Sequence, residues 1–153
     1  MRTINDLVDL LMQFSGSDGV FQTPIPRMSI MRCSAPTIPE LVLYEPSICV
    51  VAQGVKEARI DDQTYRYDSA RYLLGSVRQP VFGSVVKATK KYPYICLRLD
   101  LDSEIIVELM SLPVEEKINH AISSGLRLGE MDNELVDTVV RLAETMNDSK
   151  SID

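Results

Sequence analysis

Residues 43–76 read LYEPSICVVAQGVKEARIDDQTYRYDSARYLLGS, and this stretch decides the fold class. Its apolar run at residues 48–52 is rich in β-branched side chains, as a buried strand requires. The Gln53-Gly54 pair after that run predicts a bend or bulge, because glycine adopts backbone angles that other residues avoid. The stretch therefore begins with a buried strand that ends in a kink.

Two more strands are expected after this kink, at residues 56–60 and 63–67. Asp61 and Asp62 lie between them and are typical of a turn. A third, short strand is expected at residues 72–74. Antiparallel strands that follow one another so closely indicate a sandwich or a small barrel.

Strands are also expected on either side of this stretch, at residues 27–33, 81–88 and 94–101. The last of them alternates, with Ile95, Leu97, Leu99 and Leu101 on one face and Tyr94, Cys96, Arg98 and Asp100 on the other. The remainder of the proline-rich residues 20–40 predicts irregular chain, which is either an ordinary loop or an arm over the mouth of a barrel. The expected β unit covers residues 20–101.

An amphipathic helix is expected within residues 1–19. Thr3 and Asp6 form a capping pair at its start. The apolar stripe of this helix consists of Ile4, Leu7, Val8, Leu11 and Phe14. Gly16 and Gly19 are expected to end it. The helix either packs on its own barrel or contributes to a dimer.

Residues 102–153 are expected to form a helical segment. Asp102 predicts the cap of a first helix, and Pro113 its end. The apolar residues of that helix are Ile105, Ile106, Leu109 and Met110. Gly125 and Gly129 are expected to bracket a loop, and Asp132 is expected to cap the final helix.

The final helix carries two apolar rows. The first row, an a/d seam, consists of Leu135, Val139, Leu142 and Met146, and the second of Val136, Val140 and Ala143. In one interpretation, one row packs on the barrel and the other on a second copy, so that the seam is a dimerisation surface. In the alternative, both rows form one broad face that is buried within a single subunit.

Three pieces of the chain resemble one family in their order and spacing. They are Tyr44–Gly54, Tyr65–Ser76 with Pro80 close behind, and Tyr92–Asp102, within roughly residues 20–145. The family is the N-terminal sensor domain of AraC-type bacterial transcription regulators. The resemblance implies a cupin-like antiparallel β-barrel followed by helices that mediate dimerisation.

The same resemblance assigns DNA binding to a C-terminal module with two helix-turn-helix units. That module is expected to begin where this chain stops, at Asp153. We therefore expect the sensor part alone, as a fragment or a truncated product. A net charge of −6 agrees with this expectation, because an acidic surface repels phosphate.

The chain length and the cysteine content indicate the number of domains and the cellular compartment. The 153 residues are enough for one domain. Cys33, Cys49 and Cys96 are too few and too scattered for a disulfide framework and suit a reducing cytoplasm. Because no signal peptide and no long apolar run is visible, a cytoplasmic protein without a membrane span is expected.

Catalytic chemistry has little support in the sequence. His120 is the single histidine and lies in the expected helical region, away from every predicted strand. We therefore expect no metal site and no cofactor. No nucleophile elbow, phosphate loop or dinucleotide fingerprint is present. A metal-independent cupin-type enzyme, such as an isomerase or epimerase, is the alternative from another class.

A small barrel can enclose one small molecule among its inward side chains. The candidate ligand-binding residues are polar or aromatic residues within strands, namely Tyr44, Gln53, Tyr72, Cys96 and Arg98. Arg98 is suited to a ligand carboxylate or phosphate, unless it forms an internal ion pair with Glu45 or Asp100.

The expected function is the ligand-sensing and dimerisation domain of a transcription regulator. Its partners would be a small-molecule effector of unidentified class, a second copy of the chain, and DNA only through the C-terminal module. A further alternative is a domain that has lost its ligand and only dimerises.

Overall fold

The computed structural model describes residues 1–102, 104 and 125–152. The first helix of the expected C-terminal segment, with its apolar residues and its end at Pro113, lies outside the described residues, as does His120. Within the described residues, ten strands and two helices are present. No helix among them is long and apolar enough to cross a membrane.

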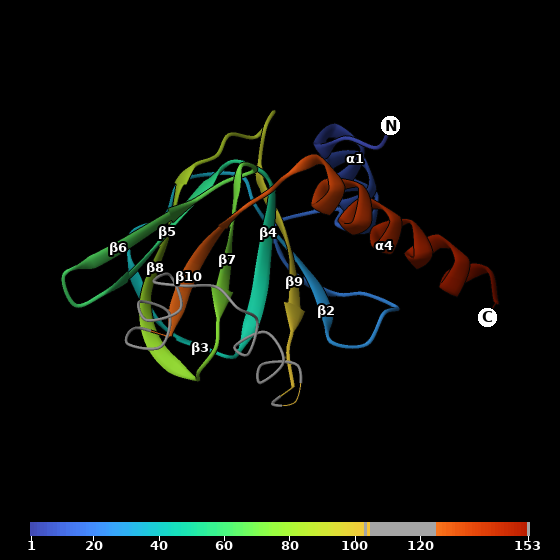
Figure 1. Ribbon diagram of the computed structural model, residues 1–153. Helices are drawn as coiled ribbons and strands as arrows, with labels where there is room; N and C mark the ends of the chain where they lie inside the picture. Colours follow the sequence, from blue (N-terminus) through green and yellow to red (C-terminus); the bar gives the residue numbers. More distant parts are fainter. Residues whose placement is uncertain (103, 105–124, 153) are drawn as a thin grey trace.

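The strands form two antiparallel sheets (Figure 1). The six-stranded sheet has the order β1 (Gly19–Gln22), β2 (Met28–Cys33), β9 (Tyr94–Asp100), β4 (Ser47–Gln53), β7 (Arg71–Gly75) and β10 (Leu126–Glu130). The four-stranded sheet has the order β3 (Glu40–Tyr44), β8 (Gln79–Lys87), β5 (Val55–Ile60) and β6 (Gln63–Tyr67). The expected cupin-like antiparallel β architecture with flanking helices is confirmed.

A buried cluster joins the two sheets and forms the interior of the barrel. The six-stranded sheet contributes Cys49, Val51, Leu73, Tyr94, Cys96 and Leu126, and the four-stranded sheet contributes Ala58, Tyr67, Val81 and Val85. The alternation predicted for residues 94–101 is confirmed, because Ile95 and Leu97 belong to a separate cluster on the outer face of the same sheet. Each central strand therefore faces two different environments.

The predicted kink after residues 48–52 is confirmed at Gly54. Its φ is +87°, and the pairing of β4 with β9 shifts register between Val51 and Gln53. A Cβ atom at position 54 would lie 2.7 Å from the carbonyl oxygen of Lys87 and 2.8 Å from the Cα atom of Tyr94. Only glycine fits this conformation and this close approach.

Two expectations about irregular chain are wrong. Residues 126–130, expected as a loop between two glycines, form β10, which pairs along its whole length with β7. Strand β1 also lies in the segment at residues 20–40, where only the strand at residues 27–33 was expected, and it is an edge of its sheet. Strand β10 depends on a partner distant in sequence, and the prolines between β1 and β2 obscured the pairing of these two neighbours, so the local pattern of glycine and proline misled the prediction.

Helix α1 (Ile4–Phe14) begins with the predicted capping box. The Asp6 amide donates to the Thr3 hydroxyl, and the Asp6 carboxylate accepts from the Thr3 amide at 2.8 Å. The helix ends before the two glycines expected to stop it, at Ser15, whose hydroxyl donates to the Leu11 carbonyl at 2.7 Å. Leu7 and Leu11 are fully buried on the outer face of the six-stranded sheet.

Helix α4 (Asn133–Ile152) begins at the predicted cap. The carboxylate of Asp132 accepts from the Leu135 amide at 2.7 Å, and its carbonyl accepts from the Val136 amide at 2.9 Å. Figure 1 shows α4 beside α1 on one side of the sheets. Its side chains join the same outer cluster as α1, so the two helices and the sheet share one core.

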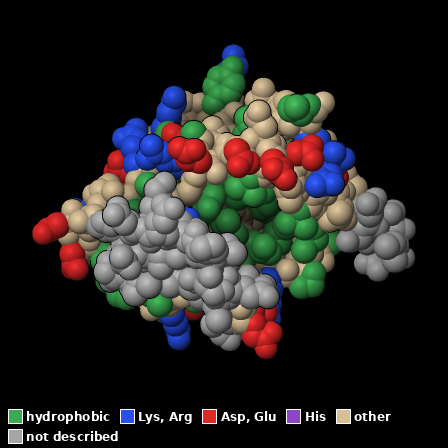
Figure 2. Space-filling view, in the orientation of Figure 1, with side chains coloured by type: hydrophobic (Ala, Val, Ile, Leu, Met, Phe, Trp, Pro, Cys, Tyr) green, Lys and Arg blue, Asp and Glu red, His purple; other side chains and the backbone are tan. Residues whose placement is uncertain are grey.

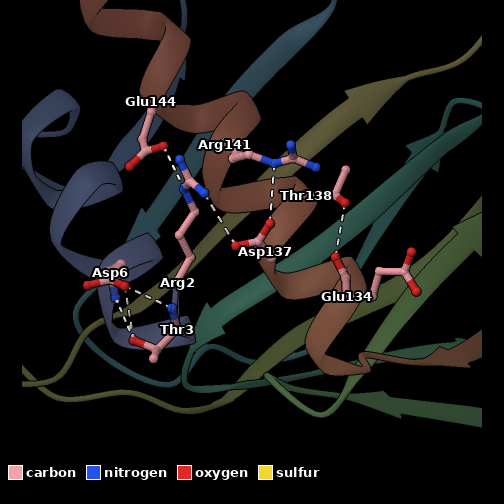
Figure 3. Close-up of polar contacts among 8 residues, drawn as sticks. All are labelled: Arg2, Thr3, Asp6, Glu134, Asp137, Thr138, Arg141 and Glu144. Carbon is pink, nitrogen blue, oxygen red and sulfur yellow. Dashed lines mark hydrogen bonds and ion pairs between the residues drawn. The ribbon is translucent and has the colours of Figure 1, made fainter.

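A basic residue of the N-terminal segment connects these two helices (Figure 3). Arg2 Nε donates to Glu144 Oε1 at 2.8 Å, and its Nη1 lies 3.4 Å from Asp137 Oδ1. Asp137 also pairs with Arg141 at 3.3 Å, one turn further along α4. The start of α1 is thereby tied to the side of α4 by exposed ion pairs.

Candidate ligand-binding cavity

A cavity of about 240 Å³ lies between the two sheets. Its lining consists of Val20, Ser29, Met31, Val42, Leu43, Tyr44, Ser47, Cys49, Lys56, Tyr67, Tyr94, Cys96 and Arg98. Two larger depressions, of about 460 and 380 Å³, are open surface grooves without such an enclosing wall. The partly enclosed and largely apolar cavity has the character of a small-molecule site.

The side chain of Lys56 is the most unusual feature of this wall. Its ammonium lies 5.8 Å from the centre of the Tyr44 ring and 5.9 Å from that of Tyr94. Its hydrogen-bond acceptor is the sulfur of Met31, at 3.7 Å. Among the described residues, no carboxylate lies within ion-pair distance of it. A half-buried cation thus faces two aromatic rings and a thioether without a compensating anion.

Two tyrosine hydroxyls beside this cation have no hydrogen-bond partner in the described part of the chain. They belong to Tyr44 and Tyr94, and the Tyr94 side chain is fully buried. Burial raises the pKa of Tyr94 well above its ordinary value, with a further contribution from the neighbouring Cys96 thiol. The hydroxyl therefore stays protonated and keeps a proton that it can donate.

The absence of a side chain at Gly83 makes room for this arrangement. A Cβ atom at that position would lie 2.9 Å from the Tyr44 hydroxyl oxygen and 3.7 Å from Lys56 Cε. Gly83 lies on β8 and faces the same interior as both residues.

Arg98, the other cation of the wall, is already neutralised. Its Nε lies 3.2 Å from Asp100 Oδ1. The pair of Arg98 with Asp100 is one of the two ion pairs that the sequence suggested. Arg98 Nε and Asp100 Oδ1 are both buried, although the two side chains as a whole are 42% and 39% exposed. The two atoms are poorly aligned for a hydrogen bond and interact as an ion pair. Glu45, the other possible partner, pairs instead with Arg78 at 3.0 Å. Among the described residues that line the cavity, the positive charge without an anionic partner is that of Lys56.

Two thiols complete the wall. Cys49 and Cys96 are diagonal neighbours on β4 and β9, because Cys49 pairs with Arg98 and Cys96 with Val51. Burial raises the pKa of Cys49 to about 12, and the adjacent Cys96 adds to the effect. Both thiols are free and buried, and they act as small apolar side chains here.

The structure brings three of the five candidate residues together. Tyr44, Cys96 and Arg98 line the cavity. Gln53 lies at the kink and donates to the Pro93 carbonyl at 2.9 Å, beside an open groove under α1. Tyr72 packs against the outer cluster, on the face of the sheet away from the cavity.

Several residues that line the cavity were not predicted from the sequence, most importantly Lys56 and Tyr94. Tyr94 shares a strand face with Cys96 and Arg98, so the alternation already placed it beside them. Lys56 alternates with Ala58 in the predicted strand at residues 56–60, which places both on one face. Because charged residues are normally assigned to the solvent face, Lys56 was not included among the candidate ligand-binding residues.

The described residues hold no group of three or more histidine, cysteine or acidic side chains that could bind a metal ion. On the outer surface, Figure 2 shows hydrophobic side chains gathered in a hollow that is bordered by acidic and basic side chains.

The predicted dimerisation seam is divided between core and surface. Met146 is fully buried and Val139 is 9% exposed, both inside the subunit's own outer cluster. Leu135 and Leu142 pack at the margin of this cluster and remain half-buried.

Three solved structures of ToxT from Vibrio cholerae are similar to this chain in fold. The chain matches apo ToxT K231A from strain SCE256 with a TM-score of 0.55 and 8% identity, covering 86% of this chain and 54% of that one. It matches unsaturated fatty acid-bound ToxT from strain SCE256 with a TM-score of 0.53 and 8% identity, covering 81% and 47%.

A third structure, ToxT from strain O395 bound to (E)-4-(8-methylnaphthalen-1-yl)but-3-enoic acid, gives a TM-score of 0.52 and 12% identity, covering 76% and 46%. The chain thus spans about half the length of the solved proteins that it resembles. At such low identity the likeness establishes the fold alone.

No curated protein sequence matches the chain. The family described as the AraC-type transcriptional regulator N-terminus, in contrast, matches residues 24–153, which is most of the chain. On this match and on the architecture that accompanies it, the chain belongs to the family of N-terminal domains of AraC-type transcriptional regulators.

Proposed function

We propose that this domain senses a small molecule inside the barrel and passes the signal to a DNA-binding module. The observation that carries the proposal is the Lys56 ammonium without an anion, beside the buried Tyr44 and Tyr94 hydroxyls, which have no hydrogen-bond partner among the described residues. All three groups line one cavity. Buried polar groups without partners are costly, and a purely structural core would replace them with apolar side chains. A ligand that satisfies them gains affinity from the same groups.

The fold offers a short route from the cavity to the helices. On β4, Cys49 and Val51 face the cavity side, whereas Val50 and Ala52 contact the outer cluster that holds α1 and α4. A ligand that shifts β4 or β9 therefore changes the surface on which α1 packs. Ligand binding would in this way bias the position of α4, the last element before the attached module.

The ToxT structures support a sensing function by analogy. Two of them are described as bound to an unsaturated fatty acid and to a naphthalenyl butenoic acid. In the proposal, this chain likewise receives an organic effector, acts in the cytoplasm and contacts DNA only through a C-terminal module outside these 153 residues.

We propose in addition that the domain forms a homodimer through the exposed margin of α4. Leu135 and Leu142 are the residues of the original seam that the subunit's own core leaves half-exposed. Two copies that bury these leucines against each other would form a two-fold interface. Dimer geometry would then set the spacing of the two DNA-binding modules.

A cavity-blocking variant tests the sensing function. Compounds from a metabolite library that raise the Tm of the wild-type domain are expected to lose this effect in Ser29→Phe, because Ser29 lines the cavity. They should keep it in the control Leu41→Phe, since Leu41 is 63% exposed. The same compounds should change operator binding by the full-length regulator. Equal stabilisation of both variants would place binding outside the cavity and overturn the proposal.

A further inference from the structure

We propose that Lys56 makes the cavity selective for a compact monocarboxylic acid. The carboxylate would pair with the Lys56 ammonium, and the hydroxyls of Tyr44 and Tyr94 would donate to it. This inference rests on the proposed sensing function and adds the chemical class of the effector.

The charge balance of the cavity is the first argument. Lys56 has no anionic partner among the described residues, whereas Arg98 is paired with Asp100. One uncompensated cation in a partly desolvated site is neutralised by one negative charge. A monoanion fits this balance, whereas a phosphate dianion would leave a buried excess of negative charge.

The available hydrogen-bond donors are the second argument. The ammonium is a donor without acceptor capacity, and the hydroxyls of Tyr44 and Tyr94 are buried without partners. These three groups come from β3, β5 and β9, so both sheets contribute to one small region. A carboxylate has two acceptor oxygens with about four lone-pair sites, which is enough to accept from all three donors.

The rest of the wall selects the body of the ligand. Met31, Val42, Leu43, Cys49 and Cys96 present carbon and sulfur. A sugar would leave its hydroxyls without hydrogen bonds against such a surface, whereas an alkyl or aryl group has no hydrogen bonds to water that it could lose. A volume of about 240 Å³ is small beside the roughly 300–1,000 Å³ of typical ligand pockets. The ligand is therefore a short-chain or single-ring acid.

Matched pairs of probes test the charge requirement. Hexanoate and hexanamide have the same shape and differ in charge, as do benzoate and benzamide. Isothermal titration calorimetry on the 153-residue domain should show each acid binding about tenfold or more tighter than its amide. A hydrogen bond to a charged group contributes about 1.5–3 kcal/mol, which corresponds to this factor.

Three variants identify the responsible cation. Lys56→Met should remove the preference for the acid over the amide, and Lys56→Arg should retain this preference. Lys87→Met removes the same charge from an exposed position outside the cavity and should behave as wild type. Circular dichroism of each variant verifies that the fold is intact.

The outcomes separate this inference from the function on which it rests. If acid and amide bind equally and Ser29→Phe abolishes both, the cavity is a binding site and the acid preference is wrong. If Lys56→Met keeps the preference, another cation holds the carboxylate and the assignment to Lys56 is wrong. If neither acid binds at about 10 mM, where even a ligand worth about −3 kcal/mol would register, the inference fails outright.

Discussion

The ring of Tyr72 lies directly over Gly129, its partner across the pair of strands β7 and β10. The two residues face each other in register, and a Cβ atom added at Gly129 would fall within the Tyr72 ring. An aromatic side chain that covers a cross-strand glycine shields the exposed backbone and fixes the pairing. This contact explains why β10 forms in a segment whose glycines predicted a loop.

A side chain at Gly129 is therefore expected to displace Tyr72. Gly129→Val should destabilise the domain by about 2 kcal/mol, because overpacking forces side chains out of their favoured rotamers. Urea unfolding followed by circular dichroism measures the change. Gly16→Val is the matched control, since nothing lies within 4 Å of a Cβ atom there. An equal loss in both variants would show that the Tyr72 contact is unimportant.

The kink at Gly54 gives a second prediction. Gly54→Ala should cost about 2–3 kcal/mol, because alanine is strained at φ +87° and its Cβ would meet the backbone of Lys87 and Tyr94. The measurement is again urea unfolding, with Gly16→Ala as control. A variant as stable as wild type would mean that the backbone relaxes without cost at this position.

The three thiols should differ in accessibility. Cys49 and Cys96 are buried in the barrel, whereas Cys33 is partly exposed. Ellman's reagent should therefore modify one thiol rapidly in the native protein and all three after unfolding. Cys33→Ser should remove the rapid phase. Fast reaction of a second thiol in that variant would contradict the closed interior described above.

Alkaline pH should destabilise the domain. Burial raises the folded-state pKa of Cys49 from 9.0 to about 12, and it raises the pKa of Tyr67 and Tyr94 well above 10.0. Groups whose folded pKa is raised contribute stability that is complete below their unfolded pKa. That stability is lost as pH rises from this value through the folded pKa.

The free energy of unfolding should thus be insensitive to these groups below pH 9 and fall above it. Each group contributes a slope of at most about 1.4 kcal/mol per pH unit. Cys49→Ala should make the fall begin later, near the unfolded pKa of tyrosine, 10.0. Urea titrations at several pH values provide the measurement, and an unchanged onset in Cys49→Ala would count against a buried, protonated thiol.

The dimer proposal yields the last prediction. Leu142→Glu should weaken self-association by tenfold or more and leave the β-sheet signal intact, because Leu142 lies at the margin of the core. Val140→Glu should instead unfold the domain, since Val140 is fully buried. Analytical ultracentrifugation and circular dichroism separate the two effects. A wild-type domain that stays monomeric at high micromolar concentration would exclude this interface.

The strands from Ser47 to Asp100 could be predicted because their signal is local. Turn residues such as Asp61 separate them, and alternation assigns each side chain of β9 to a face. Strand β10 could not be predicted in the same way, since its partner β7 is distant in sequence and its own five residues include a glycine.

The site was harder to predict than the fold. Tyr44 and Tyr72 both lie in strands, and only the register of each strand places the first inside and the second outside. The run Leu73-Leu74 beside Tyr72 gives no alternation from which that register could be read. Lys56 was overlooked because an interior cation contradicts the usual distribution of charge, and its neighbours in space come from other strands.

The alternation of β4 and β9 has a consequence for how such a sensor diversifies. Before the kink, Ser47, Cys49 and Val51 of β4 face the interior, as do Tyr94, Cys96 and Arg98 of β9, and their immediate neighbours along the chain support the helices. Substitutions that retune chemical preference can therefore accumulate at every second position while the intervening positions stay constant. One short stretch of gene can acquire a new effector and keep the old output.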